Sequence, residues 1–247
     1  MIRRLAAGLA MSSMLTGGAQ ILVTAGSMSG AVPGMWDGTM VHMVWQAGAG
    51  RAYAIRAVGL VLLALALLRN RLPWLGCIGA VIAATSFAWT GHAWSLHPNA
   101  LPMLLLSVHL LGGAFWLGAL VPLSVVARHS ELPRIAAVAF RFGSSAIYVV
   151  AALIAAGVGL LTKMLGSVSD LWASGYGRYV LLKLTLVAAL LCLAALNKLG
   201  LTPRLLAGDV RAVRSLRRSI QVELLLGALI LTVTAAFTTI SGAPALD

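Results

Sequence analysis

The chain has 247 residues, of which 60% are hydrophobic and only 10% are charged, and its formal net charge is +12. Its mean hydropathy is +0.96, whereas about 25% of the residues in a soluble domain are charged. The composition therefore excludes an ordinary soluble domain and predicts an integral membrane protein. The sequence has only six acidic residues and no HExxH, GxSxG, P-loop or CxxCH motif, which argues against an enzyme.

Seven apolar runs are long enough to cross the hydrocarbon layer, which takes about 20 residues of helix. The predicted fold is an all-α, polytopic transmembrane bundle of about seven helices. Arg3 and Arg4 also fit the basic start of a signal peptide, but no clear cleavage site follows, which favours a retained helix. The runs fall near residues 5–25, 48–68, 73–94, 101–123, 138–161, 178–198 and 219–240.

Lys and Arg are concentrated in the connections on one side of the predicted membrane, which places that side in the cytoplasm. The expected topology has a cytoplasmic N-terminus and a C-terminus on the outer side. No soluble segment exists to carry a basic nucleic-acid patch, so membrane lipid and not nucleic acid is the expected partner. The inner set is Arg3, Arg4, Arg69, Arg71, Arg128, Arg134, Arg141, Lys198, Arg204, Arg211, Arg214, Arg217 and Arg218, and the outer set is Arg51, Lys163 and Arg178.

Residues 1–47 are expected to form an N-terminal transmembrane helix followed by a Met-rich outer segment, and residues 48–247 a six-helix membrane domain. The outer segment contains Met40, His42 and Met43. Met40 and Met43 are three residues apart and share one face if this stretch is helical. Two interpretations remain open: the methionines pack over the end of the bundle, or they capture Cu(I).

The predicted topology places four of the five histidines and six of the nine methionines on the outer side. Imidazole and thioether groups together suit Cu(I). His109 lies within the fourth run, about 10 Å below the outer surface, where an ionisable side chain is by default a functional candidate. A neutral histidine bonded to a neighbouring helix is the alternative. Met103 lies near the start of the same run, and His97 lies in the preceding loop.

His92 lies near the outer end of the third run, which a short loop joins to the fourth. His92 and His109 are therefore expected on antiparallel neighbouring helices facing a common cavity. Their depths differ by about 10 Å. The two either share one metal site, through an inward kink at Gly91, a re-entrant loop or a strong tilt, or form successive stations of a path. Axial ligation of a haem by this pair is a further alternative, which the depth difference disfavours.

Charged residues also fall inside or near the ends of the apolar runs. Arg56 and Lys183 have long side chains that can reach the membrane interface. Glu223 is near the inner end of the seventh run and could pair with Arg141, which enters the fifth. We expect these residues to be structural charge partners; a role in proton coupling or gating is the alternative.

A series of short motifs follows the order Thr90-Gly91-His92-Ala93, His109-Leu110-Leu111-Gly112-Gly113-Ala114-Phe115-Trp116-Leu117-Gly118, Arg141-Phe142, Tyr176-Gly177-Arg178 with Leu181-Leu182-Lys183, Ala195-Leu196-Asn197-Lys198 with Leu201-Thr202-Pro203, and Leu216-Arg217-Arg218-Ser219-Ile220 with Glu223. In their order and spacing these motifs resemble the copper resistance D (CopD) family of bacterial inner-membrane proteins, from about residue 50 to the C-terminus. This resemblance implies a multi-pass helical protein linked to copper tolerance or uptake, with His92 and His109 as the natural metal ligands.

The functional hypothesis is a copper-handling protein that captures copper at outer Met and His groups. Copper then passes to His92 and His109 and moves toward the cytoplasm, and a periplasmic copper-binding protein could supply it. A haem-binding membrane redox protein and a copper chaperone or assembly factor that does not transport remain the alternatives.

Overall fold

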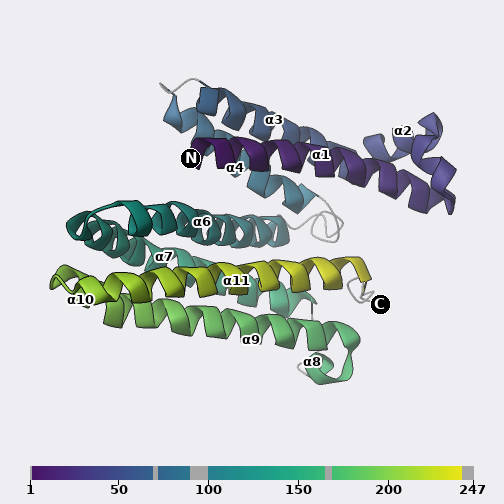
Figure 1. Ribbon diagram of the computed structural model, residues 1–247. Helices are drawn as coiled ribbons and strands as arrows, with labels where there is room; N and C mark the ends of the chain where they lie inside the picture. Colours follow the sequence, from purple (N-terminus) through teal and green to yellow (C-terminus); the bar gives the residue numbers. More distant parts are fainter. Residues whose placement is uncertain (1, 69–71, 90–99, 165–168, 241–247) are drawn as a thin grey trace. The chain divides into compact units, whose positions relative to one another are not determined.

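The computed structural model describes residues 2–68, 72–89, 100–164 and 169–240, and within these ranges it contains helices and turns but no strand. The helices form two compact units, Met1–Leu111 and Gly112–Asp247, and the chain is shown in Figure 1. The predicted all-α helical fold is confirmed. The boundary predicted at residue 47 does not coincide with this division and stays a prediction from sequence pattern.

The first unit consists of α1 packed against two shorter elements and a helical hairpin. Asp37 accepts hydrogen bonds from the backbone N–H groups of Thr39 and Met40 and so caps α2. Ile21 and Ala25 of α1 pack with Val44 of α2 to form a small core. The elements are α1 (Ile2–Ser29), the 3-10 turn η1 (Val32–Trp36), α2 (Gly38–Gln46), α3 (Gly48–Leu68), α4 (Pro73–Thr85) and the 3-10 turn η2 (Ser86–Trp89).

Helix α6 (Leu101–His129) begins in the first unit and continues into the second. The core of the second unit is built mainly from Leu, Ile and Ala side chains of α6, α7, α10 and α11. Leu120, Ile135, Leu205 and Ile220 are the largest side chains buried there. The remaining elements are α7 (Leu132–Met164), α8 (Asp170–Ala173), α9 (Gly175–Leu196), the π-helical turn η3 (Asn197–Leu201), α10 (Thr202–Leu206) and α11 (Val210–Ile240).

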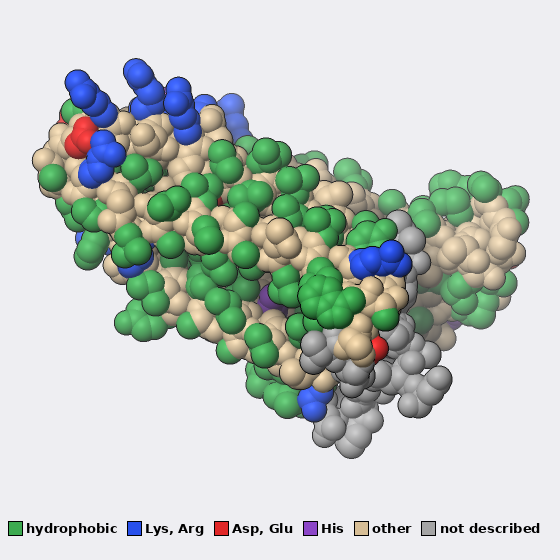
Figure 2. Space-filling view, turned by 90° about the horizontal axis from the view of Figure 1, so that it is seen from below, with side chains coloured by type: hydrophobic (Ala, Val, Ile, Leu, Met, Phe, Trp, Pro, Cys, Tyr) green, Lys and Arg blue, Asp and Glu red, His purple; other side chains and the backbone are tan. Residues whose placement is uncertain are grey.

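Among the residues that the structure describes, six helices are long and apolar enough to span a membrane, and a shorter apolar helix covers Pro73–Trp89. The end predicted for that shorter segment, at residue 94, lies outside the described residues. Large apolar side chains such as Leu184, Leu225 and Leu231 are exposed along the long helices, and Figure 2 shows hydrophobic side chains spread over the visible face. Such surfaces are stable in lipid and not in water.

Several helices extend beyond the apolar runs that predicted them. Helix α7 begins at Leu132 and not near residue 138, and α11 begins at Val210 and not near residue 219. Most of the residues between the predicted runs 178–198 and 219–240 are therefore helical. Arg is a good helix former, so a helix can continue past the apolar segment.

The helix does not end at Thr202-Pro203, because a π-helical turn precedes these residues. The backbone N–H and the hydroxyl of Thr202 both bond to the carbonyl of Asn197, the hydroxyl at 3.0 Å. Pro203 then lies in the first turn of α10, where its missing N–H is tolerated. The wider turn lets the chain remain helical from α9 into α10.

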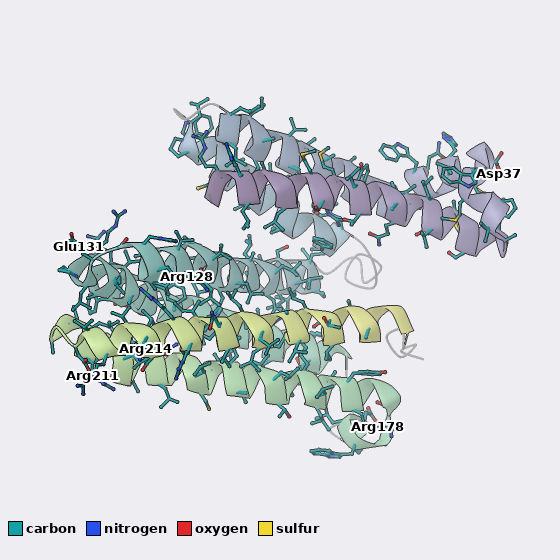
Figure 3. All side chains as sticks on the ribbon, in the orientation of Figure 1. Asp37, Arg128, Glu131, Arg178, Arg211 and Arg214 are labelled. Atoms are coloured by element: carbon teal, nitrogen blue, oxygen red, sulfur yellow. The ribbon has the colours of Figure 1, made fainter. Side chains whose placement is uncertain are left out.

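Basic side chains lie mainly at one end of the second unit. Figure 3 shows Arg128, Arg211 and Arg214 at this end and Arg178 at the other. Arg204 and Asp209 form an ion pair of 2.7 Å in the connection between α10 and α11. The Arg204 side chain and the backbone N–H of Arg211 donate to Asp209, and they hold the pKa of its carboxyl below the ordinary value.

Candidate functional site

His109 lies eight residues into α6 and is partly buried, which corresponds to about 12 Å along the helix axis. One turn further on, a Cβ at Gly112 would lie 3.2 Å from the Leu153 side chain of α7, so α6 and α7 pack closely there. A Cβ at Gly113, in contrast, would meet no atom within 4 Å among the described residues. The imidazole is therefore placed inside a membrane-spanning helix, as the sequence predicted.

The other predicted ligands near His109 are not all placed. His92 and His97 lie in residues 90–99, outside the described structure. Met103 is partly buried in the first turn of α6. It is six residues before His109, which is about 9 Å along the axis and about 120° around the helix. Met103 and His109 therefore occupy different faces, and a shared site between these two would need a third element.

The Met-rich outer segment is partly helical, and its donors divide into two groups. Met35 packs against Gly26, and Met40 packs against the core formed by Ile21, Ala25 and Val44. These two methionines fit the packing interpretation.

Met43 and His42, in contrast, are exposed on α2. The Nε2 atom of His42 lies 2.7 Å from Nε2 of Gln46, one helical turn further on. Within the described ranges, no three His, Cys, Asp or Glu side chains come together to hold a metal. The capture interpretation now depends on His42 and Met43.

The second unit contains a buried carboxylate in the apolar part of α11. Glu223 is 2% exposed, and its Oε1 atom accepts a hydrogen bond from Nδ2 of Asn197 in η3. No ion pair links it to Arg141 in the described part of the chain, and Arg141 is exposed on α7. The structure thus gives Glu223 an amide partner in place of the arginine that the sequence suggested.

Four buried polar atoms at this place have no hydrogen-bond partner among the described residues: Oε2 of Glu223, Oδ1 of Asn197, Oγ of Ser219 and Nε1 of Trp116. Ser219 is one helical turn before Glu223 on α11, and the Trp116 indole lies near the carboxylate. Two of these atoms are potential donors and two are acceptors. The cluster lacks the sulfur and imidazole groups that Cu(I) prefers.

Sequence reasoning identified Glu223 but missed Asn197 and Ser219 as its neighbours. The available signal was the spacing of Ser219 and Glu223, which places two polar groups on the face that also carries the buried Leu216 and Ile220. Asn197 gave no comparable signal, because its position follows from the π-helical turn.

Basic side chains in the second unit bond to main-chain carbonyls. Lys198 Nζ donates to the carbonyl of Gly143 at 2.8 Å, and Arg217 Nε donates to that of Ala127 at 2.7 Å. Ala127 lies in the last turn of α6, where carbonyls lack helical partners. Lys183 is partly buried in α9. These contacts join helices without using the few carboxylates of the chain.

The helices and their intramembrane polar groups define a multi-pass helical membrane protein. The family model "Copper resistance protein D-like, N-terminal domain" matches residues 1–97, and the model "Copper resistance protein D" matches residues 136–237. The chain therefore belongs to the copper resistance protein D family. The match at residues 1–97 extends the family pattern to the N-terminal segment, where the sequence motifs had not indicated it.

A similar protein is "Copper resistance protein D" of Pseudomonas syringae pv. tomato. It is 29% identical over 269 aligned residues, which cover 97% of this chain and 84% of that protein. No solved structure matches the chain. The family and the helices together show a copper-related multi-pass membrane protein.

Proposed function

We propose that this protein moves copper ions across the bacterial inner membrane along a path of His and Met side chains. Membership of the copper resistance protein D family supports a role with copper. The observation that carries the proposal is the position of His109, a partly buried imidazole inside a membrane-spanning helix. Keeping such a group in lipid is costly, so its presence favours a functional role.

In the proposed path, copper is captured as Cu(I) at the exposed His42 and Met43 of α2. It then passes to His109, with His92, His97 and Met103 as further ligands. Neutral imidazole and thioether groups bind Cu(I) without adding charge inside the membrane. No phosphate-binding loop for ATP occurs in the sequence, so transport is driven by the copper gradient or by a coupled ion.

Replacing His109 by alanine is expected to lower Cu(I) uptake into proteoliposomes about tenfold or more, because a ligand of the transported ion is lost. His92→Ala should have a similar effect. His129→Ala is the matched control, since His129 is exposed at the far end of the same helix. If both the His109 and the His92 variants match the unsubstituted protein in copper binding and in uptake, the site assignment is wrong.

The same preparation separates the alternative functions. A protein that binds Cu(I) but gives no flux in sealed liposomes would be a copper chaperone or assembly factor. A Soret band in the purified protein would favour axial haem ligation by His92 and His109. To test whether a periplasmic copper-binding protein is the donor, its copper-loaded form is added on the outer face and transfer of copper to this protein is measured.

The proposed path also requires a cytoplasmic N-terminus and a periplasmic C-terminus, which the Lys and Arg distribution supports. Single cysteines introduced within residues 90–99 should react with a membrane-impermeant thiol reagent in intact spheroplasts. A cysteine introduced at Ser130, between α6 and α7, should react only after the membrane is opened. If the cysteine at position 130 reacted in intact spheroplasts and those within residues 90–99 did not, the topology and the outer position of the ligands would be contradicted.

A further inference from the structure

The first unit contains a cavity of about 320 Å³ between α1, α3 and η2. Its wall includes Gly17 and Gln20 from α1, Tyr53 and Arg56 from α3, and Phe87 and Trp89 from η2. None of these residues is a predicted copper ligand, and a cation-lined cavity repels Cu(I). The cavity therefore calls for a different ligand.

The guanidinium of Arg56 is held in one orientation against this cavity. The residue is 8% exposed, its Nε atom donates to Oγ of Ser86 at 3.1 Å, and its Cζ atom lies 3.7 Å from the centre of the Phe87 ring. Ser86 is itself fully buried, and it donates its proton to the carbonyl of Ala83 at 2.7 Å. The hydroxyl oxygen is thereby oriented as an acceptor for Arg56.

The two terminal nitrogens of Arg56 make no hydrogen bond to any residue that the structure describes. A Cβ placed on Gly17 would lie 3.9 Å from Nη1, so the guanidinium reaches across to α1. A fixed guanidinium with unpaired N–H groups presents a planar fork to the cavity. That fork matches the two oxygens of a carboxylate or phosphate.

The first unit cannot supply a carboxylate to neutralise Arg56. Asp37 is the single acidic residue among positions 1–111, and its side chain caps α2 by accepting from the N–H groups of Thr39 and Met40. A buried charge without a partner is strongly destabilising. The counter-charge for Arg56 must therefore come from outside this unit.

The start of α3 adds to the positive potential. Gly48 and Ala49, the first residues of α3, also line the cavity. The N-terminal end of a helix carries free N–H groups and a partial positive charge, which favour anions. Tyr53, Phe87 and Trp89 provide an apolar wall beside these groups, as expected for a site that also excludes water.

We propose that this cavity, the Arg56 pocket, binds a phosphate group through the terminal nitrogens of Arg56. The phosphate group can come from a free ion or from the headgroup of an anionic lipid. The site does not depend on the proposed copper path, and its occupation neutralises the buried arginine. An occupied pocket thereby stabilises the arrangement of α1, α3 and η2.

The test uses the full-length protein purified in a neutral detergent. Sodium phosphate is titrated against sodium chloride at equal ionic strength while thermal unfolding is followed. In a second arm, the protein is reconstituted in phosphatidylcholine vesicles with or without phosphatidylglycerol, and retained lipid is measured by native mass spectrometry. Binding of free phosphate predicts a saturable rise in Tm of about 5 °C at a hundredfold excess over Kd. Binding of a headgroup predicts retained phosphatidylglycerol.

Arg56→Gln should abolish the phosphate-dependent rise and the retention of phosphatidylglycerol, and Arg56→Lys, which keeps the charge but not the fork, should weaken both about tenfold. Arg51→Gln removes the same charge from an exposed position on α3 and should leave both unchanged. The proposal is overturned if phosphate acts no differently from chloride and no phosphatidylglycerol is retained. It is also overturned if Arg56→Lys behaves as the unsubstituted protein in both arms.

Discussion

Replacing Glu223 by alanine is expected to lower the free energy of unfolding by about 3 kcal/mol. The substitution leaves the amide of Asn197 without its acceptor and opens a cavity between α11 and η3. For a chain of this size the loss corresponds to a decrease in Tm of about 6 to 12 °C. Thermal unfolding of the purified protein in detergent, followed by circular dichroism, measures it.

Glu223→Gln provides the matched comparison. Glutamine keeps the shape and retains an oxygen that can accept from Asn197, so we expect a loss of less than about 1 kcal/mol. Glu131→Ala, at an exposed position between α6 and α7, should leave the Tm unchanged. An alanine variant as stable as the glutamine variant would show that the Asn197–Glu223 contact does not hold these helices together.

Replacing Gly79 by leucine is expected to prevent the helical hairpin α3–α4 from packing. A Cβ at Gly79 would lie 2.7 Å from the backbone nitrogen of Leu63, and a Cβ at Gly59 would lie 2.6 Å from the carbonyl oxygen of Gly79. Neither backbone can move aside as a flexible side chain would. The expected cost is about 3 kcal/mol or more, with loss of monodisperse protein. Size-exclusion chromatography and the Tm of the purified protein measure it.

Gly8→Leu is the control for the hairpin, because a Cβ at Gly8 of α1 meets no atom within 4 Å among the described residues. This variant should remain monodisperse with a Tm close to that of the unsubstituted protein. Gly79→Ala should be intermediate between the two leucine variants. A Gly79→Leu protein that elutes and unfolds like the Gly8 control would refute the close approach of α3 and α4.

The membrane-spanning helices could be predicted from sequence because long apolar runs leave few alternatives in lipid. Six of the seven predicted runs correspond to helices long and apolar enough to span a membrane. The helix ends were less predictable. Arg134 and Arg211 are compatible with helix as well as with a loop, so hydropathy marks where the apolar segment ends and not where the helix ends.

The candidate site was predictable only in part. His109 inside α6 and Glu223 inside α11 were identified because ionisable groups in apolar runs are conspicuous. The partner of Glu223 could not be identified from the sequence, because it depends on how η3 and α11 are rotated about their axes. His42 and Met40 are two residues apart on α2, but His42 is exposed and Met40 is packed. This difference likewise depends on which face of α2 meets α1. The Arg56 pocket combines three segments whose proximity no local spacing encodes.

The π-helical turn at Asn197–Leu201 has a consequence for the segment that follows it. An extra residue within one turn rotates every later side chain by about 100° relative to an uninterrupted α-helix. Thr202 and Leu205 are both buried in the observed arrangement. A single inserted position therefore shifts the helical phase: it turns the inward face of α10 toward its neighbours, while Asn197, the first residue of the π-helical turn, bonds to Glu223 of α11.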